Sequence, residues 1–367
     1  MDRDLSVVFD VAHDELAEHF ERATYRGREY FHLPDERHGV ERGTVVVDDA
    51  VVRGFPSIPR VLVLDPGIPD FFDGPVTVEE KLNGYNVRLA RVDGDVLAFT
   101  RSGYVCPFTT SLAAEYPLDA FFDDHPETVV CGELIGPENP YTTHEYAEVA
   151  DAALRVFDLR DRESGEPVPT AKRRERCVEY DLPAVPAFGT HDTADAPAAI
   201  REAIDDLDDR GREGVVCKSA DGQRAVKYTT SAIHRADLAH AFDKPFDYGQ
   251  QFLLARVMRE AFQSVEFDED EQRARQRARD MGEAILLPFV ESIRDVQAGD
   301  PIGDDHTIRG DPTTIESLLN RFRALGLHLD IESDTYEGNE RVVMFTKVAD
   351  ASREKIAHYL AGGTIDE

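Results

Sequence analysis

The sequence predicts an α+β protein in which a strand-rich unit of antiparallel pairs is followed by helices. Three observations lead to this class. The chain has 367 residues, which exceeds one ordinary hydrophobic core and suggests two or three folding units. Short β-type runs recur over residues 61–232, and two Asp-Gly pairs between apolar runs are strong hairpin signals. After Ile233, apolar residues recur at helical spacing.

Residues 1–60 are expected to form a small N-terminal module. A helix is predicted near residues 12–24, and a strand is predicted over residues 44–52, where the sequence reads TVVVDDAVV. A stretch punctuated by proline, GFPSIPR, follows and is typical of a connector. The module should therefore end close to residue 60.

Residues 61–232 are expected to form the central, strand-rich domain. The predicted strands are, in chain order, VLVL at 61–64, PVTVEEK at 75–81, NVRLARV, VLAFTRS, TVVCGELIG, ALRVFDL, GVVCKS and RAVKY. Asp93-Gly94 should turn the chain between NVRLARV and VLAFTRS, and Asp221-Gly222 should do the same between the last two runs. These turns predict antiparallel pairing.

Residues 233–298 are predicted to be helical, and residues 299–367 to form a small α/β unit. The apolar positions at helical spacing are Phe252, Leu253, Val257, Met258, Phe262, Ile285, Leu286, Phe289 and Ile293. They surround a charged stretch, DEDEQRARQRARD, which is expected to be a solvated helix. Residues 299–312 resemble a loop, and residues 313–325, 341–348 and 352–360 then predict helix, strand and helix.

The charge of the chain is strongly negative, with 73 acidic against 41 basic residues and a formal net charge of −32. The acids are spread through patterned segments, as in a protein from a very salty cytoplasm such as that of a halophilic archaeon. At molar salt the Debye length falls to about 3 Å, so this charge does not exclude a nucleic-acid partner. Only seven basic residues are Lys. Where Lys persists, the chemistry can require an amine that Arg cannot supply.

Several classes of protein are disfavoured by composition. No run approaches the roughly 18 to 20 apolar residues that span a bilayer, and the N-terminus lacks the layout of a signal peptide. A cytoplasmic protein without a membrane partner is expected. The scattered cysteines, Cys106, Cys131, Cys177 and Cys217, form no C-x-x-C pair and predict small core residues rather than disulfides or zinc ligands. The histidines have no metal-binding spacing and are expected to be structural or solvated.

The main chemical signal is the segment Glu80-Lys81-Leu82-Asn83-Gly84-Tyr85-Asn86. Lys81 lies where a predicted strand ends and turns through Gly84 into the next one. A lysine in such a place can present a neutral amine to the α-phosphate of a nucleotide if nearby positive charge lowers its pKa. The tetrapeptide K-x-x-G is common by chance, and on its own it would fit a surface lysine before a hairpin.

Further polar residues follow at the ends of later strands, in a fixed order. The segments are Arg101-Ser102-Gly103, then Gly132-Glu133-Leu134-Ile135-Gly136, Val156-Phe157-Asp158, Glu213 to Lys218, and Val226-Lys227-Tyr228. Six matches in this order, counting the lysine segment, are difficult to obtain by accident.

Over about residues 60–230 the chain resembles the covalent nucleotidyltransferases, a superfamily of DNA ligases, RNA ligases and mRNA capping enzymes. The resemblance is closest to the archaeal homodimeric ATP-dependent RNA ligases, also called circular RNA ligases, and it continues into the helical region. It implies an antiparallel-sheet nucleotidyltransferase domain (an ATP-grasp-like ligase domain), a helical dimerisation domain over 233–298 and a small α/β C-terminal domain over 299–367.

The resemblance also implies a role for each motif residue. Lys81 would attack the α-phosphorus of ATP to form lysyl-AMP, and Glu80 would help to read the adenine edge. Arg101 and Glu133 would hold the ribose, and Phe157 would stack on adenine. Lys218 and Lys227 would contact phosphate oxygens, and Glu213 would bind the divalent metal. Asn86 is counted with the residues that bind the cofactor. Each of these has a structural alternative, such as a core aromatic for Phe157 or a surface acid for Glu133 and Glu213.

Two departures from the superfamily pattern bear on the substrate. The common K-x-D-G is K-x-N-G here, so Asn83 has no charge with which to hold a metal or tune Lys81. Asn86 stands where DNA ligases and capping enzymes usually have Arg, and K-x-x-G-x-N is a pattern of RNA ligases. Those other enzymes should also continue into a β-barrel after Lys227, whereas this sequence predicts helices there. Asn86 and the predicted helices in place of a β-barrel both favour an RNA substrate.

The implied activity is the ATP-dependent joining of RNA 5′-phosphate and 3′-hydroxyl ends, including ring closure, with Mg²⁺ or Mn²⁺ and as a homodimer. The metal is expected because the pyrophosphate leaving group carries charge that side chains offset only in part. Two alternatives remain open at this point. One is another polynucleotide ligase or a capping-type nucleotidyltransferase, and the other is a non-catalytic RNA-binding protein on a ligase fold.

Overall fold

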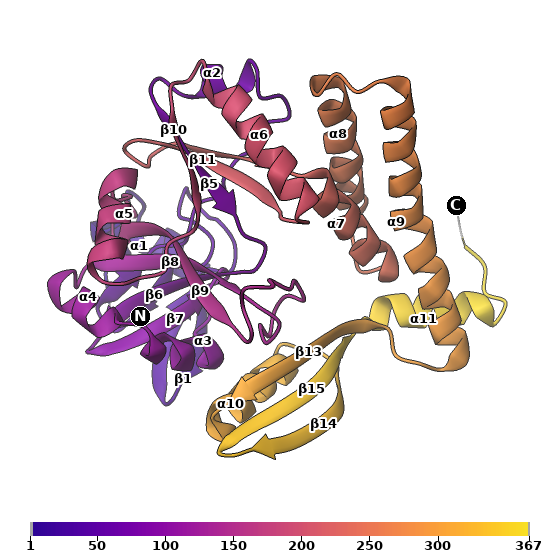
Figure 1. The fold of residues 1–367 in the computed structure, drawn as a ribbon. Coiled ribbons are helices and arrows are strands. Elements are labelled where there is room, and N and C mark those ends of the chain that lie inside the picture. The colour runs from indigo at the N-terminus through magenta and orange to yellow at the C-terminus, as the bar shows by residue number, and fades with distance from the viewer. Residues whose placement is uncertain (1–2, 366–367) are drawn as a thin grey trace.

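The computed structural model describes residues 3–365, and within them the strands form four antiparallel sheets. Figure 1 shows a β-rich body, two long helices that stand beside it, and the last sheet below. The early strands and helices of the chain build the body, and the final helix crosses the lower end of a long helix. The predicted α+β class is confirmed.

The N-terminal segment is a small sheet rather than a helix followed by one strand. Its strands are β1 (Glu21–Tyr25), β2 (Arg28–His32), β3 (Val45–Val47) and β4 (Ala50–Val52), after a 3-10 turn at Leu5–Val7 and helix α1 (His13–Ala17). The predicted helix over 12–24 is wrong beyond Ala17, because the residues of β1 pair with β2. The predicted strand over 44–52 is two strands, because Asp48 adopts a left-handed conformation (φ 51°) and turns the chain.

Two four-stranded sheets form the central domain, in the orders β10-β5-β11-β12 and β7-β6-β8-β9. The strands are β5 (Val76–Lys81), β6 (Tyr85–Val92), β7 (Asp95–Thr100), β8 (Thr128–Ile135), β9 (Ala153–Asp161), β10 (Ala187–His191), β11 (Gly214–Ser219) and β12 (Ala225–Thr229). The predicted hairpins are confirmed, since β6 pairs with β7 and β11 with β12. Asp93 and Gly94 both have positive φ, as this tight turn requires.

Two parts of the central domain, residues 61–64 and strand β10, were not predicted correctly. The run VLVL at 61–64 is not a strand, although Val61 N–H donates to the carbonyl of Lys227 at 3.2 Å. Its apolar side chains pack into the hydrophobic core instead, and Leu64 is fully buried there. Strand β10 was not predicted, because its sequence AFGTH lies at the sheet edge and is mostly exposed, so it carries little apolar signal.

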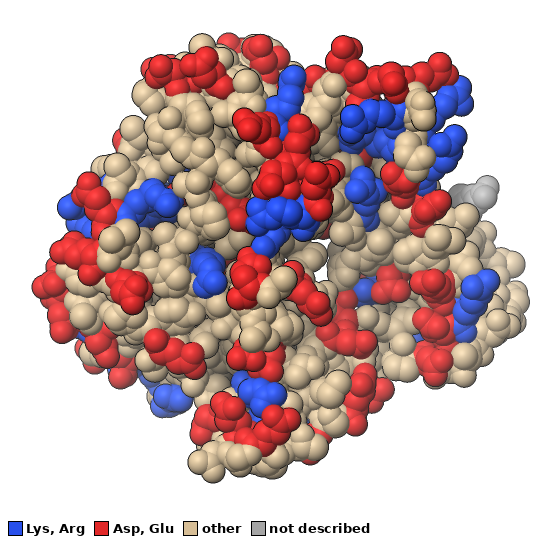
Figure 2. Space-filling view, viewed as in Figure 1, with Lys and Arg blue, Asp and Glu red and all other residues tan. Residues whose placement is uncertain are grey.

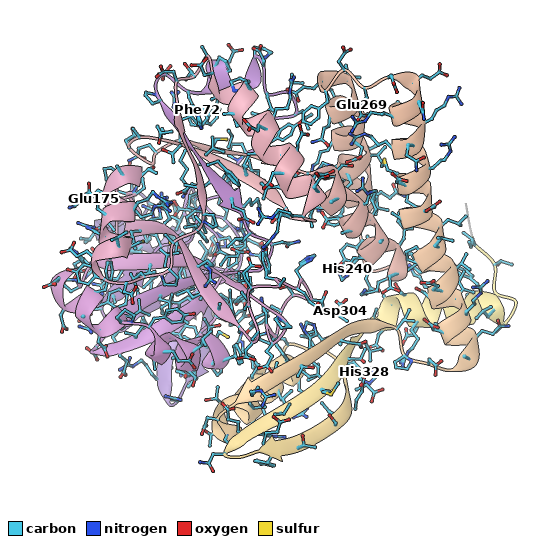
Figure 3. All side chains as sticks on the ribbon, viewed as in Figure 1. Phe72, Glu175, His240, Glu269, Asp304 and His328 are labelled. Carbon is cyan, nitrogen blue, oxygen red and sulfur yellow. The ribbon has the colours of Figure 1, made fainter. Side chains whose placement is uncertain are left out.

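Short helices cover the central sheets. They are α2 (Gly67–Phe71), α3 (Pro107–Leu112), a 3-10 turn at Ala113–Glu115, α4 (Leu118–Asp124), α5 (Thr170–Glu179) and α6 (Ala196–Asp209). Helix α6 buries Ile200, Ile204 and Leu207 against strands β5 and β11. The four-residue spacing from Ile200 to Ile204 explains why one face of α6 is apolar. Figure 3 places Phe72, which belongs to the same core, just after α2.

The helical region consists of α7 (Ser231–Asp243), α8 (Gln250–Glu266) and α9 (Glu271–Ala298), so the prediction of helices there is confirmed. The charged stretch forms the end of the turn between α8 and α9 and the start of α9, and most of its side chains are exposed. Arg277 and Glu269 are exceptions, because Arg277 is turned inward and pairs with Glu269 and with Glu260 of α8. Glu269 lies at the top of α8 in Figure 3.

The C-terminal unit contains two strands that were not predicted. Its elements are β13 (Gly303–Gly310), α10 (Pro312–Ala324), β14 (Leu329–Glu337), β15 (Glu340–Val348) and α11 (Asp350–Leu360). The helix, strand and helix predicted over 313–360 are confirmed, but residues 299–312 are not all loop. Strands β13 and β14 are polar and acidic, and they become strands by pairing with β15. Asp304 of β13 contacts Lys244 (2.9 Å) and faces His240 (3.5 Å; Figure 3).

The acidic composition is visible on the surface. In Figure 2, red acidic side chains are spread over all parts of the visible face, and the largest group of blue side chains lies over the upper ends of α8 and α9. All four cysteines are buried, which confirms that they are core residues. Among residues 3–365, no helix combines the length and the apolar character needed to cross a membrane.

Candidate active site

Lys81 is the last residue of β5 and points toward Glu213, which precedes β11. The Lys81 Nζ and Glu213 Oε2 atoms are 2.5 Å apart. The pairing register explains the contact, because Lys81 lies opposite Gly214 in the antiparallel pair of β5 and β11. Both side chains are only partly exposed, at 24% and 14%. An amine and a carboxylate therefore meet at the end of two neighbouring strands.

Gly84 allows the lysine segment to approach strand β8. A Cβ atom at this position would overlap the carbonyl oxygen of Leu134, so a larger residue would push β6 away from β8. The two strands are in register directly after Gly84, with Asn86 opposite Glu133. The glycine thus brings Glu133 close to the end of β5, where Lys81 lies.

Eight of the nine residues predicted to form the site line one pocket between the two central sheets. They are Glu80, Lys81, Asn86, Arg101, Glu133, Phe157, Lys218 and Lys227. The ninth residue, Glu213, lines a neighbouring pocket and reaches the first through its contact with Lys81. Residues from β5, β6, β8, β9, β11 and β12 therefore meet in one place, although more than 140 positions of sequence separate the first from the last.

The aromatic wall of the pocket is formed by Phe157 and Phe55. Their ring centroids are 5.1 Å apart, and the rings are nearly perpendicular. Phe157 is partly buried, and Lys218 Nζ lies 5.8 Å from the centre of its ring. A planar apolar surface next to polar groups is suited to hold a flat heterocyclic base.

Lys218 is held deep in the wall by a group of buried charges. Its amine donates to the carbonyl oxygen of Phe157 at 2.5 Å and lies 3.4 Å from Glu79. Glu79 also forms ion pairs with Arg173 and Arg174. The positive charges of Lys218 and Arg173 outweigh the effect of burial and lower the pKa of Glu79. This carboxylate is therefore ionised and is one of four linked charges behind the pocket.

Glu80 points to the opposite side of β5 from Glu79 and Lys81. Burial raises its pKa, although Arg212, whose Nε lies 3.8 Å away, acts in the other direction. One of its carboxylate oxygens is buried and has no hydrogen-bond partner in residues 3–365. Such a group is free to accept a hydrogen bond from a ligand.

Lys227 has an unusually acidic ammonium group. Burial and the charges of Arg60 and Lys81 lower its pKa to about 8. In residues 3–365 its amine forms neither an ion pair nor a hydrogen bond to another side chain. A lysine that gathers with other cations and lacks a carboxylate of its own is suited to bind an anion.

Glu133 lies at the floor of the pocket and is partly buried. Burial raises its pKa to about 7, and the negative charge of Glu213 contributes in the same direction. Lys81 opposes this shift. Two carboxylates near one lysine thus repel each other, and a bound cation would relieve the repulsion.

The carboxylates fit a divalent metal only if a substrate completes its ligands. Residues 3–365 contain no group of three or more His, Cys, Asp or Glu side chains arranged to hold a metal ion. Mg²⁺ is commonly held by one or two carboxylates together with substrate phosphates and water. Glu213 and Glu133 match that limited requirement.

Two polar side chains hold the turn between Lys81 and Gly84. The Asn83 amide nitrogen Nδ2 lies 2.6 Å from Nε2 of His144, and Asn83 N–H donates to the Tyr146 hydroxyl at 2.6 Å. Asn83 is therefore engaged in fixing the turn, as expected for a position that lacks the carboxylate of the superfamily pattern.

The sequence did not reveal several residues that line the pocket. They are Phe55, Pro56, Ser57 and Ile58 from the connector, with Glu79, Leu82, Val185 and Val216 from the central domain. The connector was recognised only by its prolines, and its residue types carry no chemical signal. Ser57 Oγ is 3.5 Å from the guanidinium of Arg101, which is otherwise exposed.

Comparison with known proteins relates both parts of the chain to ligases. The RNA ligase family model matches residues 74–229, and the model of the Ligase Pab1020 C-terminal region matches residues 240–363. An uncharacterized protein from Methanocaldococcus jannaschii is 38% identical over 95% of this chain and 93% of its own.

Solved structures of two ligases match nearly the whole chain. An archaeal ATP-dependent RNA ligase, solved in two forms, is 37% identical and covers 98% of both chains, with a TM-score of 0.92. A provisionally named ATP-dependent DNA ligase from Aquifex aeolicus is 25% identical and covers 95% of this chain and 97% of its own, with a TM-score of 0.89. Because the agreement extends through the central domain, the helical region and the C-terminal sheet, this chain belongs to the family of archaeal ATP-dependent RNA ligases.

Proposed function

We propose that this protein is an RNA ligase that transfers AMP from ATP to Lys81 and then joins RNA 5′-phosphate and 3′-hydroxyl ends. The observation that carries the proposal is the position of Lys81. Its amine lies at a pocket that also holds an aromatic wall, three carboxylates and two further lysines. Phosphoryl transfer depends mainly on positioning and on neutralising charge, and these groups provide both.

The reaction has three steps. In the first, the neutral Lys81 amine attacks the α-phosphorus of ATP, a P–N bond forms, and the P–O bond to pyrophosphate breaks. In the second, an oxygen of the RNA 5′-phosphate attacks the same phosphorus, so that AMP passes to RNA and Lys81 is regenerated. In the third, the RNA 3′-hydroxyl attacks the activated 5′-phosphorus and AMP leaves.

The residues around Lys81 have distinct proposed roles in nucleotide binding. Phe157 stacks on the adenine, and the unpartnered carboxylate oxygen of Glu80 accepts a hydrogen bond from its edge. The ribose is held by Arg101 and Glu133, with Asn86 beside them on the neighbouring strand. In the ligand-free protein the Lys81 amine is held by Glu213, so it becomes available to ATP when this carboxylate is drawn to another group.

The phosphates are neutralised by Lys218, Lys227 and a divalent metal. Glu213 would hold Mg²⁺ or Mn²⁺, with Glu133 close by, and the metal would supply positive charge for the leaving pyrophosphate. The low pKa of Lys227 agrees with a group that becomes fully charged when a phosphate approaches. Lys218 is less accessible, because it already contacts Glu79.

The resemblance to the archaeal RNA ligases extends the proposal to intramolecular joining and to a homodimer. The exposed apolar face of α8 supports the dimer. Leu254, Val257, Met258 and Val265 recur at helical spacing on this helix and are 40% to 81% exposed. Apolar exposure of this kind is typical of a protein–protein contact. Ring closure would be tested by treating products with an exonuclease, which degrades linear RNA and spares circles.

The first experiment is incubation in high salt with ATP labelled at the α-phosphate, followed by denaturation. Wild-type protein should retain the label, and Lys81→Ala should lose it to below about one thousandth. Lys81→Arg should fail equally, because a guanidinium does not lose its proton near neutral pH. The proposal is refuted if wild-type protein retains no label and mass spectrometry finds no AMP on Lys81. That result would favour a non-catalytic RNA-binding protein.

The second experiment separates the substrates. Single-stranded RNA, single-stranded DNA and nicked duplex DNA, each with a 5′-phosphate, are compared with ATP and with GTP. Sealing of RNA with ATP is the expected result. Preference for nicked DNA would instead favour DNA ligase activity. This outcome is relevant because the similar structure from Aquifex aeolicus is named as a DNA ligase.

A further inference from the structure

A second group of cations lies beyond Lys227, outside the pocket that fits the nucleotide. It consists of Arg60, from the connector before the central domain, and Arg259, from helix α8. Both line one small cavity next to β12, together with Thr229 and His234. The charges of Glu213 and Asp237 act on both arginines. Within residues 3–365, however, neither arginine forms an ion pair, which requires an explanation in a chain with a formal net charge of −32.

Arg60 is fixed beside Lys227 through its backbone. The N–H of Lys227 donates to the carbonyl of Pro59 at 3.0 Å, and the N–H of Val61 donates to the carbonyl of Lys227 at 3.2 Å. This pairing sets Arg60 next to Lys227 in register. The guanidinium of Arg60 donates to the hydroxyl of Thr229. Burial, and after it the charge of Arg259, lower the pKa of Arg60 to about 10, while Glu213 and Asp237 act in the opposite direction.

Arg259 approaches from the helical region and is partly buried. Within residues 3–365 it forms neither an ion pair nor a side-chain hydrogen bond. Its neighbour Arg256 is different, because it pairs with Asp237 at 2.8 Å. Arg173 and Arg277 likewise have carboxylate partners, and the buried Arg88 has its guanidinium bonded to three backbone carbonyls. Arg60 and Arg259 are therefore the cations here with donor groups available to a ligand.

A chain of hydrogen bonds holds Arg60 in place. Arg60 can only donate to Thr229, so the Thr229 hydroxyl donates its own proton to Nε2 of His234, 2.6 Å away. His234 is then neutral and donates from Nδ1 to Glu260 at 2.6 Å. Glu260 is anchored in turn by Arg277 at 2.6 Å. The residues that orient Arg60 thus come from all three helices of the helical region.

We propose that Arg60 and Arg259 form a second phosphate-binding site, next to Lys227, which binds a phosphate group of the substrates beyond the α-phosphate of ATP. His234 is a positioning residue that holds Arg60 for this contact. A guanidinium presents paired donors that match the oxygens of a phosphate. The phosphate belongs either to RNA or to the triphosphate tail of ATP. The inference rests on the proposed ligase function and assigns part of the substrate contact to the helical region.

The test measures the two halves of the reaction separately, with the full-length protein. The first half is lysyl-AMP formation at varied ATP. The second half is sealing of RNA that already carries a 5′-linked AMP, in the absence of ATP. The variants are Arg60→Gln, Arg259→Gln and the double variant, with Arg60→Lys to retain the charge. Arg22→Gln, an exposed arginine of the N-terminal sheet, controls for the loss of one charge.

If the site binds RNA, Arg60→Gln and Arg259→Gln raise the KM for adenylated RNA roughly tenfold and leave lysyl-AMP formation within twofold. The salt dependence of RNA binding should also become shallower by about one unit in log–log slope for each phosphate that the variant no longer binds. If the site binds the triphosphate tail, the KM for ATP rises instead and sealing of adenylated RNA is unchanged. Arg60→Lys should retain part of either activity.

His234→Gln should cause a smaller change of the same kind as Arg60→Gln, with the KM affected more than kcat. Circular dichroism and thermal unfolding establish that each variant is folded. If both halves of the reaction are unchanged in the folded double variant, the second phosphate site is refuted while the ligase function stands. If wild-type protein forms no lysyl-AMP, the proposed ligase function itself is refuted. This outcome is distinct from failure of the second phosphate site, which is judged by comparing the variants with an active wild type.

Discussion

The central domain and helix α8 place charged and apolar side chains in opposite ways. Behind the pocket, the charged side chains of Glu79, Arg173 and Lys218 are buried and paired with one another, and each is at most 6% exposed. On α8, large apolar groups are exposed, and Val265 reaches 81%. The pocket is therefore lined and supported by residues of one chain, whereas the surface of α8 is suited to be covered by another molecule.

The two regions should therefore affect two different properties, the unfolding free energy of the chain and its association with other chains. Buried ion pairs cost desolvation, and they persist because each charge has a partner and further hydrogen bonds. Exposed apolar groups cost little in the folded chain but favour association in water. Changes in the central domain should therefore alter the unfolding free energy, and changes on α8 should alter the oligomeric state.

The strongest test of the buried charges is Glu79→Gln. It leaves Arg173 and Lys218 buried without a carboxylate, and we expect a loss of about 3–5 kcal/mol in unfolding free energy. Chemical denaturation monitored by circular dichroism measures this loss. Glu175→Gln on α5 is the matched control, because Glu175 is exposed and, within residues 3–365, pairs only with Lys172, and it should cost less than about 1 kcal/mol (Figure 3). Equal effects of the two variants would contradict the proposed importance of burial.

The second test concerns the exposed face of α8. The double variant Leu254→Asp and Met258→Asp should convert a dimer to a monomer, because charges in an apolar contact must lose their hydration. Light scattering coupled to size-exclusion chromatography measures the mass. The unfolding free energy of the chain should change by less than about 1 kcal/mol, since both positions are exposed. A wild-type protein that is monomeric at all concentrations would exclude this role for α8.

The third and smallest effect is a pH-dependent gain of stability in Glu133→Gln. The pKa of Glu133 in the folded protein, about 7, is above its ordinary value of 4.5. The folded state therefore holds this proton more tightly than the unfolded chain, and the contribution of Glu133 to stability falls as the pH rises from about 4.5 to 7. Because the Gln side chain does not ionise, the Glu133→Gln variant does not lose stability in this pH range.

Without metal or nucleotide, Glu133→Gln should therefore be more stable than wild type at pH 8, by on the order of 1–2 kcal/mol, and similar to it at pH 4.5. Thermal unfolding at the two pH values is the measurement. The same variant should lose ligation activity, since Glu133 is proposed to hold the ribose. A gain that does not depend on pH would indicate a packing effect rather than relief of buried charge.

Much of the fold could be predicted from local sequence patterns. Apolar alternation and the turn at Asp93-Gly94 identified β6 and β7, because tight turns with positive φ require particular residues. Strand β14 could not be predicted, since most of its side chains are exposed and only its hydrogen bonds to β15 make it a strand. The predicted helix over 12–24 ended early for a related reason, because pairing with β2 overrides local helix preference.

The sequence by itself predicted which residues are candidates to carry chemistry. The rarity of Lys and the order of the strand-end motifs singled out Lys81, Glu133, Lys218 and Lys227 before any geometry was known, and these residues do line one pocket. Only the tertiary structure decided how their charges interact. The contact of Lys81 with Glu213, the low pKa of Lys227 beside Arg60, and the approach of Arg259 from α8 all depend on segments far apart in the chain. Burial and distance set electrostatic energies, and both exist only once the sheets and helices have packed together.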